Sequence, residues 1–339
     1  MNPPRSFVET TPRASSPVVE VVEIRDPTAA GEGAGVLIQE VVQLETKPLR
    51  ARRILVRLDQ SLVVLHSTNL RVRARTTLRD RMLAFVVFGP QAGGMVNGLP
   101  LRPDLIMAAQ PGIQVEFVVE PEYESVTVVV PPDALESQFV GRQREARLRS
   151  PVGVEVLDAT PSHARELFGW GKRLTTAAAR QPSLFDGRRE TLAAAQTELM
   201  ELLLAALEGT TAPHYTRSDQ TRQVHGRVVR LAEEYALAHS ADCLYVKDLC
   251  VAAGVSERSL EYAFREVMGL SPVAYLTRLR LHRVRQALRM ADHGSTTVSA
   301  EALNWGFWHF GEFSRAYKSC FGELPSETLR RRTAEEDGK

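Results

Sequence analysis

Residues 246–256 have the sequence VKDLCVAAGVS, and this stretch decides the fold of the last third of the chain. Its apolar residues recur at three- and four-residue spacing, which predicts a short helix with one buried face. Ala253 is small and Gly254 can adopt a left-handed conformation, so the chain can turn tightly where two helices meet. Ser256 is a favoured N-cap for the next helix. The pattern predicts a helix-turn-helix unit.

The second helix of this unit is expected from Glu257 to Met268, where Gly269 ends it. Leu260, Phe264 and Val267 supply its buried face. Its opposite face carries charged and aromatic side chains, namely Glu257, Arg258, Glu261, Tyr262 and Arg265.

A long helix is predicted next, with Ser271 as its N-cap and Pro272 in its first turn. It extends to about Met290, and about eighteen residues at 1.5 Å each give a length of roughly 27 Å. Its many arginines are expected on a solvated face. They are Arg278, Arg280, Arg283, Arg285 and Arg289.

The helical pattern then repeats. Residues 298–305 predict a second short helix, Gly306 supplies the turn, and an exposed helix is expected over about 311–321. Gly322 stops this helix, and Pro325 begins a last short one. The expected buried face of the exposed helix consists of Phe310, Phe313, Tyr317 and Phe321.

These segments resemble the DNA-binding domain of AraC/XylS-family transcription regulators. The resemblance is carried by AGVS at 253–256, LSP at 270–272, WGF at 305–307, FSRAYK at 313–318 and FGELPS at 321–326. One helix-turn-helix pattern would be a weak signal, whereas two units in this order and at this spacing are specific. The resemblance implies an all-α DNA-binding domain with two helix-turn-helix motifs over residues 222–333, followed by a short tail at 334–339.

The resemblance also implies how DNA would be bound. The second helix of each unit would enter the major groove, and the long helix would space the two units by nearly one DNA turn of about 34 Å. The implied base-facing residues are Arg258, Glu261, Tyr262, His309, Glu312 and Arg315, and those nearer phosphate are Ser256, Arg265 and Lys318. Arg can bind guanine and Glu can accept from cytosine, and each good pair gives about 1–3 kcal/mol of discrimination.

The predicted DNA-binding face is unusually acidic. Glu261 and Glu312 would repel phosphate, so they must face bases or solvent, and Tyr262 stands where many relatives carry arginine. Residues 222–333 contain sixteen Lys/Arg and twelve Asp/Glu, a net charge of +4, which leaves −3 for the rest of the chain. We therefore expect this domain to depend on base contacts and geometry more than on charge.

The sequence from 36 to 130 consists of short runs of Val, Leu and Ile separated by Gly and Pro, which predicts many short strands. Asn97–Gly98 is a strong signal for a tight hairpin. We predict a cupin-like β-barrel over residues 36–132 that acts as a sensor or dimerisation domain. Residues 1–35 are expected to be mostly disordered.

Residues 133–208 predict a helical linker. Its clearest helix, at 190–207, has apolar residues at helical spacing. This apolar stripe either packs onto the barrel or forms a homodimer seam. Residues 209–221 are polar and predict a flexible linker, so the whole chain is expected to be an α+β multidomain protein.

Composition argues against several other classes of protein. The three cysteines lack C-x-x-C spacing, and His66 is the only histidine in the first 160 residues, so no metal site is expected. No nucleophile motif or phosphate loop appears, which predicts a protein that is not an enzyme and has no cofactor. No apolar run reaches the length of about 18 residues that a membrane span needs, and the N-terminus lacks the apolar core of a secretory signal. A cytoplasmic bacterial location is expected.

The expected function is transcription regulation through promoter half-sites in double-stranded DNA, as an activator and homodimer that senses an effector. The small-molecule effector would bind in the N-terminal barrel, and RNA polymerase is a further expected partner. The alternative is a ligand-independent DNA-binding regulator whose N-terminal domain serves only dimerisation or contact with another protein.

The sequence does not name the effector. Arg71, Arg73 and Arg75 alternate and therefore share one face of a strand, which makes them weak candidates for binding an anionic effector. The competing interpretation is a strand edge that faces solvent.

Overall fold

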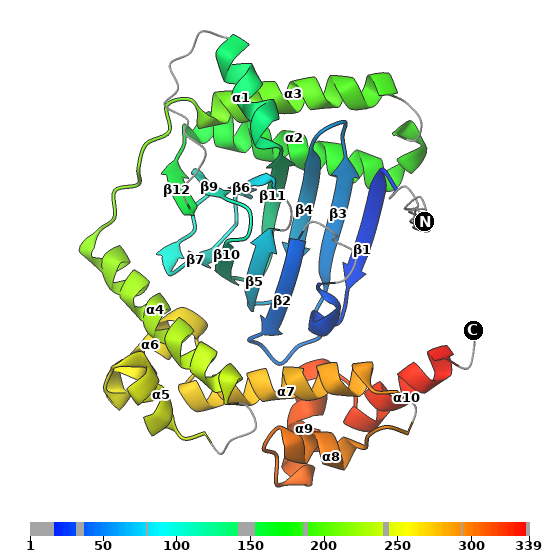
Figure 1. Ribbon diagram of the computed structural model, residues 1–339, viewed down its shortest axis with the longest axis vertical. Coiled ribbons are helices and arrows are strands. Elements are labelled where there is room, and N and C mark those ends of the chain that lie inside the picture. Colours follow the sequence, from blue (N-terminus) through cyan, green and yellow to red (C-terminus); the bar gives the residue numbers. More distant parts are fainter. Residues whose placement is uncertain are drawn as a thin grey trace, which may run out of the picture.

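A computed structural model of the protein describes residues 17–31, 37–78, 81–141, 153–185, 189–239, 244–292 and 294–336. Two β-sheets form the N-terminal half, and helices cover the outer face of the larger sheet (Figure 1). The C-terminal helices lie at the opposite end of the sheets. The predicted architecture, a β domain followed by helices and an all-α C-terminal domain, is confirmed.

The strands form two antiparallel sheets. The seven-stranded sheet has the order β1 (Val19–Ile24), β3 (Ala51–Arg57), β4 (Leu62–Thr68), β11 (Tyr123–Val130), β6 (Leu83–Phe88), β9 (Leu105–Ala109) and β12 (Val154–Asp158). The five-stranded sheet has the order β2 (Leu37–Gln43), β5 (Val72–Leu78), β10 (Gln114–Val119), β7 (Gly94–Val96) and β8 (Leu99–Pro100). Among the described residues the strands stay in these two sheets, so the cupin-like domain is not one closed barrel.

Residues of strand β6 show how the sheets are layered. Val86 and Phe88 belong to the core between the two sheets, whereas Phe85 and Val87 belong to the core on the outer face. Successive side chains of a strand point to opposite faces, so a strand buried on both faces is apolar throughout. This explains why the sequence here shows continuous apolar runs instead of alternation.

The predicted hairpin at Asn97–Gly98 is confirmed. It connects β7 to β8, and both residues have positive φ angles, 48° and 80°. Two positive φ angles are what the tight type I′ hairpin turn requires, and Asn and Gly adopt them most readily.

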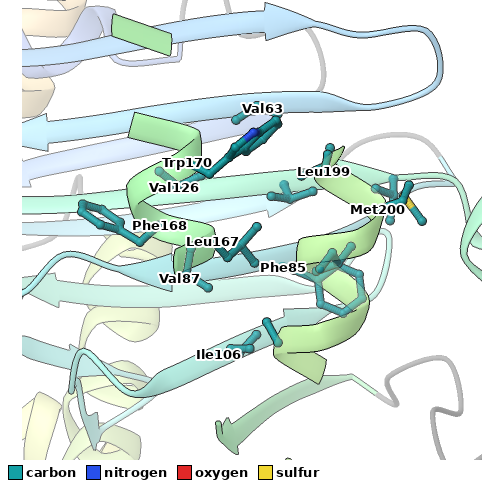
Figure 2. Close-up of a cluster of buried hydrophobic side chains, with 14 of the residues drawn as sticks. Val63, Phe85, Val87, Ile106, Val126, Leu167, Phe168, Trp170, Leu199 and Met200 are labelled. Atoms are coloured by element: carbon teal, nitrogen blue, oxygen red, sulfur yellow. The ribbon is translucent and has the colours of Figure 1, made fainter. Parts of the chain in front are cut away.

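The predicted helical linker contains helices α1 (Pro132–Gly141), α2 (Pro161–Arg180) and α3 (Arg189–Leu207), and α3 coincides with the helix expected at 190–207. Figure 2 shows Leu167 and Trp170 of α2 and Leu199 of α3 packed on the large sheet, all at most 5% exposed. The apolar stripe of α3 is therefore buried inside its own chain. Of the two interpretations of this stripe, packing onto the sheet is the one observed.

The structure differs from the sequence-based expectations at three places. Strand β1 and a short 3-10 helix, η1 (Pro27–Ala29), lie within residues 1–35, because the alternating sequence VEVVEI can pair with β3 at the sheet edge. Strand β12 lies within the helical linker and pairs with β9. Residues 1–16 and 32–36 lie outside the described residues.

The third difference concerns the polar segment 209–221. Helix α4 (Arg217–Ala238) already begins inside it. Thr216 caps this helix, and the Asp219 side chain accepts in return from the backbone N–H of Thr216 at 2.9 Å. This reciprocal capping box satisfies two backbone donors and starts the helix before residue 222.

The C-terminal helices confirm the predicted pattern. They are α5 (Val246–Ala253), α6 (Glu257–Met268), α7 (Pro272–Met290), α8 (Val298–Asn304), α9 (Phe310–Phe321) and α10 (Pro325–Glu336). Gly254 follows α5 with a φ of 66°, as expected for a turn that favours glycine. The hydroxyl groups of Ser256 and Ser271 cap α6 and α7.

A buried carboxylate joins the two halves of the protein. Glu233 of α4 is 2% exposed. Its Oε2 accepts hydrogen bonds from Arg73 Nη2 at 2.6 Å and Arg75 Nη2 at 2.5 Å, both on β5, and its Oε1 accepts from the Tyr275 hydroxyl of α7. Burial opposes the charged form, but the charges of Arg73 and Arg75 outweigh it and hold the pKa of Glu233 below its ordinary value. We call these four residues the Glu233 junction.

The Glu233 junction corrects the prediction for the alternating arginines. Arg73 is 3% exposed, so the strand face is buried and not open to solvent. Arg71 donates to the backbone carbonyl of Val267 at 3.1 Å, so it too contacts the C-terminal helices. The three arginines share one face, as the alternation predicts, but that face packs on the DNA-binding half and does not line the space between the sheets. They are therefore not effector ligands in that space.

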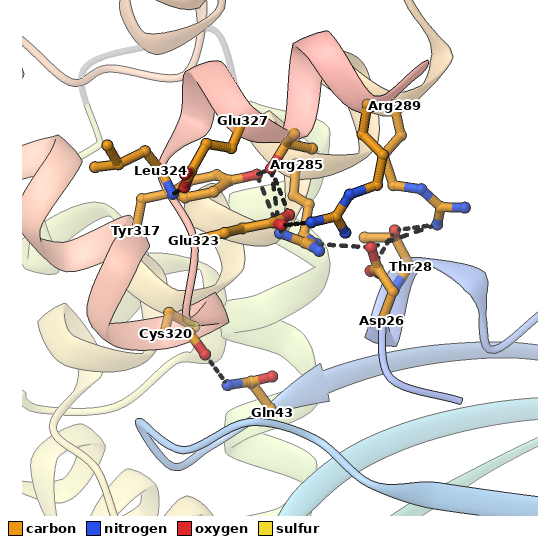
Figure 3. A network of polar contacts seen from close by, with 12 residues as sticks. Asp26, Thr28, Gln43, Arg285, Arg289, Tyr317, Cys320, Glu323, Leu324 and Glu327 are labelled. Carbon is orange, nitrogen blue, oxygen red and sulfur yellow. Dashed lines mark hydrogen bonds and ion pairs between the residues drawn. The ribbon is translucent and has the colours of Figure 1, made fainter. Parts of the chain in front are cut away.

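A second set of polar contacts joins α7 and α9 to the β domain (Figure 3). Arg285 Nε lies 2.8 Å from Asp26 Oδ2, and Arg285 Nη1 lies 2.9 Å from Glu323 Oε1. The Gln43 side chain donates to the Cys320 carbonyl at 2.5 Å. Arg285 is 5% exposed, which contradicts the expectation that every arginine of this helix lies on a solvated face.

The packing of α2 generates a stability prediction. A Cβ atom added at Gly171 would lie 2.5 Å from Val126 Cγ1, whereas one added at Gly169 would meet only Arg173 Nη1, at 3.3 Å. We expect Gly171→Ala to lower the free energy of unfolding by about 1–3 kcal/mol, as overpacking does. Gly169→Ala is the control and should stabilise by up to about 1 kcal/mol, because alanine favours helix. Equal effects in denaturant titrations would contradict this packing.

The Glu233 junction generates a second prediction. Glu233→Ala should lower the free energy of unfolding by about 3–5 kcal/mol, because buried Arg73 and its neighbour Arg75 would then share the single carboxylate of Glu116. The adjacent Glu234 is exposed, so Glu234→Ala is a matched control and should change stability by less than about 0.5 kcal/mol. Chemical denaturation measures both, and similar values for the two variants would refute the role of Glu233.

The same carboxylate gives this prediction a pH dependence. Because the pKa of Glu233 is lowered in the folded protein, its stabilising contribution is complete above the ordinary value of 4.5 and is lost as the pH falls through the folded value. The difference in stability between wild type and Glu233→Ala should therefore shrink in acid. A difference that does not change with pH would contradict the ion pair.

Candidate nucleic-acid interface

The two helix-turn-helix units share one helix as their support. Tyr275 and Leu276, near the start of α7, belong to the core of the first unit, with residues of α4, α5 and α6. Leu281, Val284 and Leu288, farther along α7, belong to the core of the second unit, with residues of α8 and α9. At 19 residues, α7 is about 28 Å long. It therefore fixes the distance between the two recognition helices, α6 and α9.

The exposed face of α6 carries the residues predicted for the first unit. Leu260 and Phe264 are fully buried, which leaves Arg258, Tyr262 and Arg265 exposed on the other side. Arg265 Nε donates to Glu261 Oε1 at 2.8 Å along the helix. This ion pair offsets the negative charge of Glu261, so the face repels phosphate less than its sequence suggests.

Two predicted contacts of the first unit also have partners within the chain. The Ser256 hydroxyl accepts from the backbone N–H of Ser259 at 3.2 Å, so it caps α6 at the position expected to approach phosphate. The ring of Tyr262 is 64% exposed and lies edge-on to His225, with 5.4 Å between ring centroids. His225 in turn contacts Glu266. Tyr262 is thereby oriented by α4.

The exposed face of α9 carries the predicted residues of the second unit. Phe313 and Tyr317 are buried, and Glu312, Arg315 and Lys318 are exposed. His309 stands at the N-cap position without a side-chain cap bond. The structure therefore gathers the predicted contacts on two helices, one set at each end of α7.

The start of α9 departs from the sequence-based expectation. Phe310 is 43% exposed, although its spacing from Phe313 predicts burial. The helix begins at Phe310, so this residue lies in the first turn, beyond the core that Phe307 and Phe313 build with ring centroids 5.0 Å apart. Trp308 is 68% exposed. Spacing alone does not identify this exposed aromatic pair.

A second candidate site lies between the two sheets. It is a cavity of about 110 Å³. On the same measure, a cavity needs only about 10–15 Å³ to hold one water molecule. Most of its wall is apolar and includes Val86, Met107 and Phe117. Its polar side chains include Gln39, Thr76 and Thr127. The cavity can hold a small, largely apolar molecule.

His66 lines this cavity and is neutral at physiological pH. Burial, and then the charge of Arg53, lower its pKa to about 3. A neutral imidazole can donate one hydrogen bond and accept another. Arg53 itself is engaged, because its Nη2 donates to the Ala30 carbonyl at 2.7 Å and to Gln39 Oε1 at 2.5 Å.

Within the described ranges, no group of three or more His, Cys, Asp or Glu side chains is placed to hold a metal ion. Cys250 and Cys320 are free thiols, and Cys243 lies outside the described residues. None of the described helices is long and apolar enough to cross a membrane.

The chain is similar to known proteins over part of its length. A family model described as a helix-turn-helix domain matches residues 249–331. The chain is 31% identical over 211 residues to the probable thc operon regulatory protein of Rhodococcus erythropolis, a match to 59% of this chain and 62% of that protein. It is 37% identical over 106 residues to the XylDLEGF operon transcriptional activator 1 of Pseudomonas putida, a match to 31% of each chain.

A solved structure of a probable AraC family transcriptional regulator from Rhodopseudomonas palustris is 40% identical, covers 31% of this chain and 96% of its own, and has a TM-score of 0.29. The matched region spans less than two thirds of the length of both curated relatives. The family-model match nevertheless spans both helix-turn-helix units. Residues 249–331 therefore form an AraC-type helix-turn-helix domain, similar to that of AraC/XylS-type transcription regulators.

Proposed function

We propose that the protein activates transcription by binding promoter half-sites in double-stranded DNA, and that a small molecule held between the two sheets controls it. The observation that carries this proposal is the pair of exposed recognition helices on one rigid support, α7. Such a support lets α6 and α9 enter neighbouring major-groove segments on one face of the duplex. The operon regulators and activators among the relatives support this function.

The chemistry of the two helices suits direct base contacts. Arg258 on α6 and Arg315 on α9 are exposed, and arginine binds guanine O6 and N7 in a bidentate manner. Glu312 is exposed on the same helix as Arg315 and can accept a hydrogen bond from cytosine N4. Ser256, Arg265 and Lys318 lie at the edges of these faces, where phosphate would pass.

Strand β5 offers a physical route from the cavity to the DNA-binding half. Val72, Ala74 and Thr76 line the cavity, while Arg73 and Arg75, on the opposite face of the same strand, belong to the Glu233 junction. A ligand that displaces β5 would therefore alter the contacts of α4 and α7. Such control requires that the ligand bind the two arrangements with different affinity.

The alternative function is a ligand-independent regulator whose N-terminal domain only dimerises or contacts another protein. The homodimer and the contact with RNA polymerase stay predictions. The apolar stripe of α3, which suggests a dimer seam in the sequence, is largely buried against the rest of the chain.

We expect Arg258→Ala and Arg315→Ala each to weaken specific DNA binding by about 1–3 kcal/mol and to relax one base preference. The DNA site is first obtained by selecting sequences bound by the full chain from a random pool. Arg180→Ala is the control, because Arg180 is exposed at the end of α2 in the β half. Equal weakening on all sequences would show that the two arginines contact only phosphate.

We expect a cavity ligand to raise the melting temperature, by an amount that corresponds to about 2.7 kcal/mol at a hundredfold excess over Kd. Thermal shift against a metabolite library identifies such a ligand. Ala109→Leu places three more carbons in the cavity and should abolish the shift without unfolding the protein. Failure of every compound to change either stability or DNA affinity would favour the ligand-independent alternative.

A further inference from the structure

The first turn of α9 and the loop just before it expose two large aromatic side chains. Trp308 is 68% exposed and Phe310 43%, although folded proteins usually bury such rings. Phe307, between α8 and Trp308, packs with buried Phe313 and so takes the core position at this turn. The core of the second unit is therefore complete without Trp308 and Phe310, and both rings are left for contact with another molecule.

No contact within the chain explains why the second residue of α9, Gly311, is a glycine. Its φ lies outside the left-handed region, and a Cβ atom added there would meet no atom within 4 Å. Neither backbone conformation nor packing requires glycine here, and glycine disfavours helix. Glycine is also the residue that lets another molecule approach the backbone closely. Gly171, by contrast, is explained by Val126, 2.5 Å from the added Cβ.

The surroundings of this turn identify the other molecule. His309 and Glu312 share the turn, and Arg315 lies one turn farther along, with its Nε donating to the Gly311 carbonyl at 3.3 Å. All lie on α9 or at its N-cap. Under the proposed function α9 enters the major groove of DNA, so these residues would meet the base edges exposed there. The apolar group that the bases present in that groove is the C5 methyl of thymine.

We propose that Trp308 and Phe310 recognise thymine by packing on its C5 methyl group, and that Gly311 allows the first turn of α9 to lie close against the DNA. This inference rests on the proposed DNA-binding function and adds an apolar mode of base recognition to it. It assigns to the second recognition helix a sequence preference that its charged side chains do not supply.

The test uses the full chain and the DNA site that it selects from a random pool. Each thymine of the site is replaced in turn by deoxyuridine, which removes only the methyl group. For the wild type, at least one replacement in the half-site bound by α9 should weaken binding by about fourfold, the value of one buried methyl group. For a double variant that combines Trp308→Ala with Phe310→Ala, the same replacement should have no effect. Met290, also 68% exposed but at the end of α7, provides the control Met290→Ala, which should keep the wild-type response.

Gly311→Ala is a second, independent variant. Its melting temperature should equal or exceed that of the wild type, because alanine favours helix and meets no atom of the protein. Its specific DNA binding should nevertheless be lost. Unchanged binding by Gly311→Ala, a half-site without thymine, or replacements without effect would each overturn the inference. Failure of the wild type to select any DNA would instead refute the proposed function.

Discussion

Glu233 and its partners determine how the two halves of the protein sit against each other. Its carboxylate is 2% exposed and stays charged because Arg73 and Arg75, which also pair with Glu116, lie beside it. Its partners come from β5 and α7, so the contact holds only when the sheet and the helices have one particular arrangement. Removing Glu233 leaves Glu116 as the shared carboxylate of both arginines and leaves the Tyr275 hydroxyl without its acceptor, which makes other arrangements unfavourable.

Helix α7 extends this constraint to both helix-turn-helix units. Its first part contacts the Glu233 junction through Tyr275, and its later part contacts the β domain through Arg285 and Asp26. His282, between them, accepts from the backbone N–H of Gln43 at 3.2 Å. Each unit packs on one part of α7, so a shift of the β domain would move the two recognition helices as one body. In this arrangement the sheet controls where the recognition helices lie, while their spacing stays the same.

Local patterns in the sequence predict the helices well, because caps, turn glycines and apolar spacing act over a few residues. The alternation of Arg71, Arg73 and Arg75 likewise predicts a shared strand face. What covers that face is not predictable from local pattern, because Glu233 lies 160 residues from Arg73 along the chain. The same limit explains Arg285, whose partner Asp26 is 259 residues away. Phe310 is mispredicted for a different reason, since periodicity does not show where a helix begins.

The two recognition helices differ in chemistry, and this difference bears on how the protein would sit on DNA. On α6, Glu261 and Arg265 offset each other's charge, and under the proposed function Arg258 and Tyr262 would make the base contacts. On α9, exposed aromatic rings precede Glu312 and Arg315. Because α7 holds the two different helices in a fixed order, a DNA site that fits both would be asymmetric, and the protein would bind it in one orientation. Residues 222–333 carry a net charge of only +4, so attraction to phosphate would stabilise reversed or nonspecific binding only a little. The orientation of the protein on DNA would then be set by its contacts with the bases.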